Sequence, residues 1–250
     1  MNKNTKKKVL SLALIIALLA IAVVGGSLAW FTAEDSAENT FTIGSVEIVQ
    51  HEKQYSGEKD QHGRPILEDF KDDKVLLPIV NVDAPNTDKN YQDKMVYVQN
   101  VGKNDAYVQT HIAVDERLKD YIRLFLTPGY EHSWTAVNET LDPSGRYYVY
   151  TYRYVSAIKP TQGTTQILQG VYMDHRVNIQ DNPGTEAVDP QFCILNEKNE
   201  YEFSGVLVDD NTKIHVLVAS QAVQADGFAN AKEALDAAFG SNLPDFSQVQ

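Results

Sequence analysis

The sequence predicts a mainly β protein, an antiparallel β-sandwich decorated by a few short helices. Short stretches in which apolar and polar residues alternate recur along most of the chain. Clusters of Asn, Asp, Gly and Pro separate these stretches, and helical spacing of apolar residues is confined to short segments. A chain of 250 residues can bury a sizeable core, so either one elaborated domain or one domain with a small appendage is expected.

The first 29 residues have the order of a secretory signal peptide. Four lysines lie within the first eight residues, an apolar run follows at residues 9–24, and small residues Ser27 and Ala29 precede Trp30. The apolar run of 16 residues is shorter than the roughly 20 that span a bilayer as a helix. We therefore expect cleavage after Ala29, with an uncleaved N-terminal anchor as the weaker alternative.

Residues 30–49 are expected to form a polar leash followed by a strand with a break. Phe41 and Ile43 share one parity, and Val46 and Ile48 share the other. One extra residue at the intervening Gly-Ser pair would return all four side chains to the same face, as in a β-bulge. Residues 40–49 are therefore a candidate strand for pairing with a sheet edge.

The β-sandwich is expected over residues 50–240, with a polar surface insertion at about 50–94. The insertion contains Asp83, Asp88 and Asp93 among asparagines, and a second acidic group includes Asp209 and Asp210. These oxygens could bind calcium weakly, but neither group has the spacing of an EF-hand. Ordinary turns and solvated loops are the favoured interpretation.

A hairpin is predicted where residues 95–99 and 106–114 alternate around a turn rich in Asn, Gly and Asp. Asp115 then resembles the N-cap of a short helix. The apolar residues of that helix would be spaced at helical intervals: Leu118, Ile122 and Phe125.

A long strand is predicted at residues 147–155, where every second residue is a tyrosine. The tyrosine row, which would line one face of this strand, comprises Tyr148, Tyr150, Tyr152 and Tyr154. Three interpretations are open for the row. It can pack under a helix or the facing sheet, form a lateral protein contact, or serve as a stacking platform for carbohydrate.

Further strands are predicted at residues 165–168, 176–179, 202–208 and 214–219. A C-terminal helix is predicted at about 226–239, with Phe228, Ala231 and Leu235 in one apolar stripe and Gly240 after its end. Residues 241–250 are polar and are expected to be a flexible tail.

The charge and cysteine content exclude several classes of partner. The chain has a net charge of −12, and loss of the four leader lysines, with no acidic residue, would bring it to −16. Nucleic acids and anionic lipids attract basic surfaces, so neither is an expected partner. Cys193 is the only cysteine, so no intramolecular disulfide can form. Its apolar neighbours favour a small buried side chain.

No catalytic, cofactor-binding or metal-binding motif is recognisable. A zinc peptidase motif needs two histidines one helical turn apart with a glutamate beside the first, and none of the six histidines has that spacing. The chain also lacks a Gly-x-Ser-x-Gly elbow and a Gly-rich phosphate loop. We therefore expect that the protein is not an enzyme and that it binds no cofactor.

Two motifs resemble those of a known group of exported proteins. Residues 25–32, Gly-Gly-Ser-Leu-Ala-Trp-Phe-Thr, and residues 39–44, Asn-Thr-Phe-Thr-Ile-Gly, resemble the TasA and camelysin family of Gram-positive bacteria, which a SipW-type signal peptidase processes. Residues 94–114 and 222–228 also look like this family. The resemblance implies a jelly-roll-like sandwich and a SipW-type peptidase as a partner.

The resemblance also implies a function. In TasA-like proteins an N-terminal strand passes into the next subunit, and head-to-tail repetition gives a filament. The expectation is a secreted subunit of a biofilm matrix or cell-surface fibre, associated with the membrane only before cleavage. Its partners would be further copies of itself, together with possible other matrix proteins. The candidate donor strand would be anchored by four apolar residues: Phe41, Ile43, Val46 and Ile48.

Three alternatives stay open at this stage. The N-terminal strand can pair within its own sheet. The chain can be a monomeric surface adhesin or binding module. A camelysin-type metallopeptidase is less favoured because of the histidine spacing.

Overall fold

The computed structural model describes residues 32–36, 39–41, 46–71, 76–184, 189–209, 212 and 214–246. The predicted leader, with Ser27, Ala29 and Trp30, lies outside the described residues, and so does Ile43. The described chain is an antiparallel β protein, which confirms the predicted fold class. No helix among the described residues is long and apolar enough to cross a membrane.

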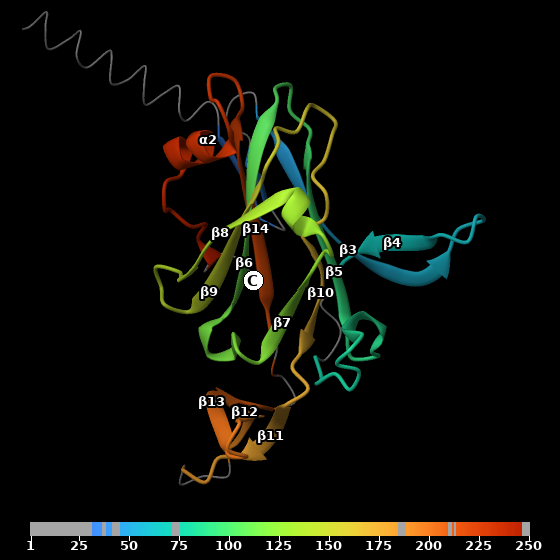
Figure 1. Cartoon of the computed structure of the whole chain (residues 1–250), viewed down its shortest axis with the longest axis vertical. Helices are drawn as coiled ribbons and strands as arrows, with labels where there is room; N and C mark the ends of the chain where they lie inside the picture. The colour runs from blue at the N-terminus through green and yellow to red at the C-terminus, as the bar shows by residue number, and fades with distance from the viewer. Residues whose placement is uncertain are drawn as a thin grey trace, which may run out of the picture.

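Two large antiparallel sheets form the body of the molecule (Figure 1). The six-stranded sheet has the order β2-β1-β14-β6-β9-β8. Its strands are β1 (Thr32–Ser36), β2 (Asn39–Phe41), β6 (Ala106–Asp115), β8 (Trp134–Leu141), β9 (Tyr147–Tyr154) and β14 (Val216–Gln224). The five-stranded sheet has the order β4-β3-β5-β10-β7. Its strands are β3 (Ile48–Lys59), β4 (Pro65–Asp69), β5 (Gln92–Asn100), β7 (Ile122–Leu126) and β10 (Leu168–Met173).

A third, three-stranded sheet lies at one end of the sandwich, below the two large sheets in Figure 1. It contains β11 (Val177–Asp181), β12 (Pro190–Leu195) and β13 (Tyr201–Leu207). Phe192 and Ile194 of β12 pack with Leu118 and Ile122 of the sandwich in one buried cluster. The appendage is therefore joined to the main core through apolar side chains.

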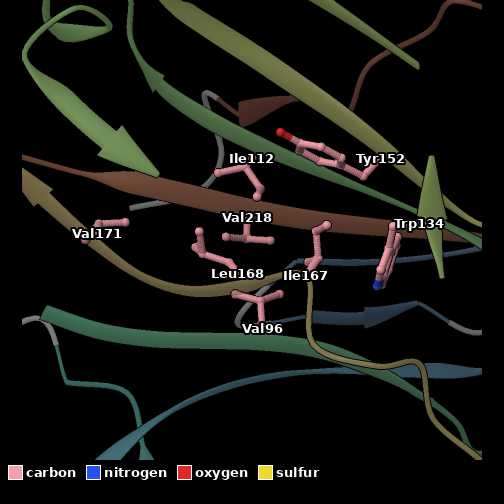
Figure 2. Close-up of a cluster of buried hydrophobic side chains, with 8 residues drawn as sticks. All are labelled: Val96, Ile112, Trp134, Tyr152, Ile167, Leu168, Val171 and Val218. Carbon is pink, nitrogen blue, oxygen red and sulfur yellow. The ribbon is translucent and has the colours of Figure 1, made fainter. Parts of the chain in front are cut away.

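The main core lies between the two large sheets. Figure 2 shows Val96 and Leu168, from the five-stranded sheet, meeting Ile112 and Val218, from the six-stranded sheet. These side chains alternate with outward-facing neighbours, so period-two patterning places one apolar face of each sheet against the other. The jelly-roll-like character comes from the chain path, because β5, β6, β7 and β9 fall alternately in the two sheets.

The predicted hairpin is a corner between the sheets instead. β5 pairs with β3 and β10, whereas β6 pairs with β14 and β9. Buried Asn100 shapes the corner, because its side-chain amide donates to the carbonyls of Asn104 and Ile158 at 2.8 and 2.9 Å. Two alternating strands around a polar turn signal a hairpin equally well, and only the partner strands decide between the two arrangements.

The helix predicted after Asp115 is limited to a single 3-10 turn, Glu116–Leu118. Asp115 does cap that turn, since its carboxylate accepts from the backbone N–H of Arg117 at 3.0 Å. Ile122 and Phe125 belong to β7, which pairs with β10. Sheet pairing therefore overrides the helical spacing of a short segment, which carries little information by itself.

The predicted polar insertion contains two strands. β3 and β4 form a hairpin that projects from the body of the molecule (Figure 1). Gln50 and Gln54 point to the inner side of β3 but are buried among hydrogen-bonding partners. Polar residues at inward positions hide the alternation that usually reveals a strand.

The C-terminal region is more ordered than predicted. α2 (Ala231–Ala238) starts later than expected, because the side chain of Asn230 accepts from the backbone N–H of Glu233 at 3.0 Å and so caps the helix. Beyond the helix, Phe246 is buried and its ring lies 6.1 Å from that of Tyr147. Residues 241–246 therefore cover the outer side of the six-stranded sheet, and the prediction of a flexible tail is wrong for them.

Candidate functional site

The described N-terminal segment lies on an edge of the six-stranded sheet. β1 begins three residues after the predicted cleavage site at Ala29 and pairs antiparallel with β14, from Thr32 opposite Val223 to Ser36 opposite Ala219. β2 folds back and pairs with β1 on its outer side. β1 therefore lies in the segment predicted to be a polar leash, and it pairs within the sheet of its own chain. The strand predicted at residues 40–49 is instead divided between β2 and β3.

β14 is an inner strand only because β1 is present. Its other side pairs with β6 over the whole length of the strand. Its inward-facing residues Val218, Ser220 and Ala222 are at most 1% exposed. Without β1, the backbone groups of residues 219–223 would lie at an open edge, where they can pair with an extended strand from any source. We call this stretch the β14 edge.

A buried polar bridge holds the β14 edge against the facing sheet. The Ser220 hydroxyl donates to Gln50 Oε1 at 2.7 Å and therefore accepts from the Thr110 hydroxyl at 2.9 Å. The amide of Gln50 donates to the carbonyl of Val218 at 3.1 Å and to Glu52 Oε1 at 2.9 Å. Buried polar groups are tolerated when they are paired, and here the pairing fixes β14 relative to β3 without using β1.

Lys94 completes this bridge on the five-stranded sheet. Its ammonium group pairs with the carboxylate of Glu52 and lies 4.0 Å above the centre of the Phe70 ring. The side chain of Lys94 is 5% exposed, and that of Glu52 is 12% exposed. Removing one partner would leave a poorly solvated charge, so the two side chains act as a structural pair.

The four predicted donor anchors do not form one strand. Phe41 ends β2 opposite Glu34, while Ile48 begins β3 opposite Asn100. Val46 and Ile48 are buried in the core cluster that also contains Ala222. Because they belong to the core of their own chain, they cannot leave it with a donor strand. The segment that pairs with the β14 edge is Thr32–Ser36, which has no apolar alternation in the sequence to identify it.

The tyrosine row lies on the side of β9 that faces the core, although only Tyr152 is fully buried. Tyr152 is buried in the cluster shown in Figure 2, and Tyr150 and Tyr154 pack against the same cluster. The Tyr154 ring lies 5.1 Å from Trp134, and the Tyr148 ring lies 5.2 Å from Tyr150. Of the three interpretations, packing under the facing sheet describes the row, so the candidate contact face at these residues is corrected.

The outer side of the six-stranded sheet carries a buried polar chain. His111 accepts a hydrogen bond at Nδ1 from the Thr151 hydroxyl at 2.9 Å, and its Nε2 donates to Gln221 Oε1 at 3.1 Å. Gln109 also donates to Gln221, at 2.7 Å. Burial lowers the pKa of His111 to about 4, and the nearby Arg153 acts in the same direction. The imidazole is therefore neutral near pH 7 and serves to link strands.

This chain continues to the helix. Arg153 donates to Gln109 Oε1 at 3.2 Å and to Asp236 Oδ1 of α2 at 2.6 Å. Lys232 donates to the other carboxylate oxygen of Asp236 at 2.8 Å. Apolar contacts of Ala234 and Leu235 with Val223 of β14 complete the docking of α2. These contacts hold α2 against the outer side of the six-stranded sheet, and we call them the clamp between helix and sheet.

The described residues contain no group of three or more His, Cys, Asp or Glu side chains placed to hold a metal ion. In the acidic loop for which ordinary turns were favoured over weak calcium binding, Asp88 accepts from the backbone N–H groups of Asn81, Asn90 and Val80, and these hydrogen bonds lower its pKa. Asp88 therefore ties the loop together. Cys193 is buried, and burial raises the pKa of its thiol. The absence of enzymatic activity stays a prediction.

The chain matches no family model, no curated protein and no solved structure. The resemblance to the TasA and camelysin family therefore stays a prediction, as do secretion and processing after Ala29.

Proposed function

We propose that this chain is a secreted structural protein that forms an extracellular matrix or surface fibre by exchange of its N-terminal strand after signal peptide cleavage. One observation carries the proposal: β1, close behind the predicted cleavage site, completes the sheet at the β14 edge. Backbone hydrogen bonds hold β1 there, and the β14 edge of every copy offers the same groups.

The exchanged element follows from the burial pattern. Val46 and Ile48 are fixed in the core, so the moving segment ends before Val46. β1 of one copy would leave its own β14 edge and pair with that of the next copy. The donor and acceptor surfaces differ, so the contact is heterologous and repeats without closing. The pairing within one chain is then the closed form of the same interaction.

The membrane-bound precursor would be unable to exchange freely. Before cleavage, β1 would be joined through two residues, Trp30 and Phe31, to a leader that remains in the membrane. A SipW-type signal peptidase would release the segment, and assembly would begin outside the cell. The net charge of −12 disfavours nucleic acid as a partner, so further copies and other matrix proteins remain the proposed partners.

Strand exchange can be detected with two single-cysteine variants in a C193A background. Ala33 lies opposite Ala222 in the β1 and β14 register. The A33C and A222C chains, each beginning at Trp30, are mixed and oxidised. A disulfide-linked pair of one A33C and one A222C chain is expected, because only exchange brings the two positions together. The doubly substituted chain should instead close on itself and stay monomeric until it is reduced.

Electron microscopy tests the resulting assembly. The chain beginning at Trp30 should form filaments, whereas the chain that begins at Gly44 and keeps Val46 and Ile48 should not. Monodisperse particles from the intact chain, without mixed disulfides, would favour the monomeric binding module.

A further inference from the structure

The outer side of the five-stranded sheet is rich in aromatic rings and carries no α-helix. α2, the α-helix of the described chain, lies on the six-stranded sheet (Figure 1). The pairing register places His51 beside Tyr97 on β3 and β5, and Arg123 beside Tyr172 on β7 and β10. We call this surface the aromatic face, and its rings are His51, Tyr55, Tyr91, Tyr97, Phe125 and Tyr172.

The rings form two groups. His51 and Tyr97 are stacked, with ring centres 4.7 Å apart and planes inclined by 22°. Tyr91 lies 5.7 Å from Phe125 and 6.5 Å from Tyr172. Burial raises the pKa of Tyr91, and the proximity of Asp93, Tyr55 and Tyr172 adds to this effect. Tyr55 lies four residues after His51 on β3, so it shares the side of the strand with His51 and extends the face onto the β3–β4 hairpin.

A glycine gives Tyr91 its position. A side-chain Cβ at Gly170 would lie 2.2 Å from the Tyr91 hydroxyl oxygen and 2.5 Å from the carbonyl oxygen of Gln92. Without a side chain at 170, the Tyr91 ring lies directly on β10 and is 8% exposed. It supports the half-buried rings of Phe125 and Tyr172 beside it. The second group is therefore held in a fixed arrangement.

The charges on the aromatic face are internally compensated. Lys53 pairs with Asp69, and Arg123 donates to Asp174 at 3.0 Å. Asp93 adds a negative group near Tyr91, and the whole chain has a net charge of −12. An anionic ligand would be repelled by this charge and would find these cations already paired. The face therefore suits a neutral ligand.

We propose that the aromatic face binds a neutral polysaccharide chain. A pyranose ring has a C–H face that stacks on aromatic rings and a rim of hydroxyl groups that needs hydrogen-bonding partners. The rings of Tyr97 and Tyr172 supply the stacking. Gln99, whose Oε1 lies 3.2 Å from His51 Nε2, adds a polar side chain on the same side of β5 as Tyr97. The two groups of rings lie on β5 and its neighbours, so an extended chain of sugars can contact both. This function is independent of strand exchange, because the β14 edge belongs to the other sheet.

Binding can be measured with the chain from Trp30 to Gln250, which contains every described element. The probes are cellulose, chitin, starch and a soluble β-1,3-glucan as neutral polysaccharides, with polygalacturonate as an anionic one. The variants are Y97A and Y172A. The control is Y201A, which removes an exposed tyrosine from the three-stranded sheet. Thermal melting and sedimentation velocity of each variant monitor folding and self-association.

We expect binding to at least one neutral polysaccharide, weakened about tenfold by Y97A or Y172A and unchanged by Y201A. Polygalacturonate should bind more weakly than the neutral probe. The proposal is overturned if no neutral polysaccharide binds, or if binding is the same in all variants. It is also overturned if Y97A and Y172A change only self-association, since the face would then be an interface between copies. Failure of strand exchange would leave this result unaffected.

Discussion

The two sheets of the sandwich differ in what covers their outer sides. The six-stranded sheet is covered by α2 and residues 241–246, and its polar side chains are joined in a buried chain from Thr151 to Asp236. Among the residues that the structure describes, no α-helix lies on the outer side of the five-stranded sheet, which carries half-buried aromatic rings and compensated charges. The comparison shows that the same alternating pattern gives a second small core on one sheet and an accessible surface on the other. Four amino-acid substitutions test this difference between the two sheets.

The largest loss of stability is expected from a substitution within residues 241–246, which cover the outer side of the six-stranded sheet. F246A deletes a fully buried ring that packs against Tyr147, so it should lower the free energy of unfolding by about 3–5 kcal/mol. The control, Y97A, removes a ring from the open face and should cost less than about 1 kcal/mol. Urea unfolding of both variants measures the difference. Equal losses would mean that residues 241–246 do not cover the sheet.

The second effect depends on pH and comes from His111. Its pKa in the folded chain is about 4, below the ordinary value of 6.5 that the unfolded chain retains. Between pH 6.5 and 4 the unfolded state therefore binds a proton that the folded state does not, and stability falls as the pH is lowered. This difference is worth about 3 kcal/mol.

The variant H111Q removes the titrating group. Because carboxylates also titrate near pH 4, the test compares the pH dependence of unfolding in the parent chain and in H111Q. The parent should lose more stability on acidification. If the free energy of unfolding changed with pH equally in the two chains, His111 would not be buried in the folded state.

The third substitution tests the close packing of Tyr91 against Gly170 on the aromatic face. G170A places a methyl group against the Tyr91 hydroxyl and the carbonyl of Gln92, so it should destabilise the fold by about 1–3 kcal/mol and displace Tyr91. G184A is the control, because its Cβ would meet only the flexible side chain of Asn182 at 3.2 Å. Thermal melting and tyrosine fluorescence report the two effects. If G170A changed neither the melting temperature nor the tyrosine fluorescence, the rings of the aromatic face would not be held in a fixed arrangement.

The smallest effects separate two ion pairs on the same carboxylate. D236A should cost about 1–2 kcal/mol, because it leaves Arg153, whose side chain is 10% exposed, without its partner on α2. K232A removes only an exposed pair and should cost below about 0.5 kcal/mol. Chemical denaturation gives both values. If the two costs were equal, the clamp between helix and sheet would contribute nothing measurable.

Some elements could be predicted from the sequence because their pattern is local. β9 was predicted from its alternating tyrosines, and β14 from its alternating apolar residues, since period two is visible in any stretch of this length. β8 and β12 carry no comparable alternation and were missed. β3 was missed because Gln50 and Glu52 occupy inward positions, and their hydrogen-bonding partners on other strands are far away in the sequence.

The candidate site was predicted only in part. The sequence indicated that the N-terminal region supplies an edge strand, but it favoured residues 40–49 for their apolar alternation. In the structure Thr32–Ser36 pairs with β14, and β2 lies outside it at the sheet edge. Backbone pairing between strands so far apart in the sequence leaves no local pattern. No pattern in the sequence predicted the aromatic face, because its rings come from four strands and a loop that lie far apart along the chain.

The sequence by itself determined the class of fold, because alternation and turn chemistry are properties of neighbouring residues. It also determined the acidic charge, and it predicts the leader. Only the tertiary structure decided which alternating face is core and which is surface, and it placed the tyrosine row inside and the rings around Tyr91 outside. The reason is physical: a strand has two faces of similar composition here, and burial depends on what the rest of the chain packs against each of them.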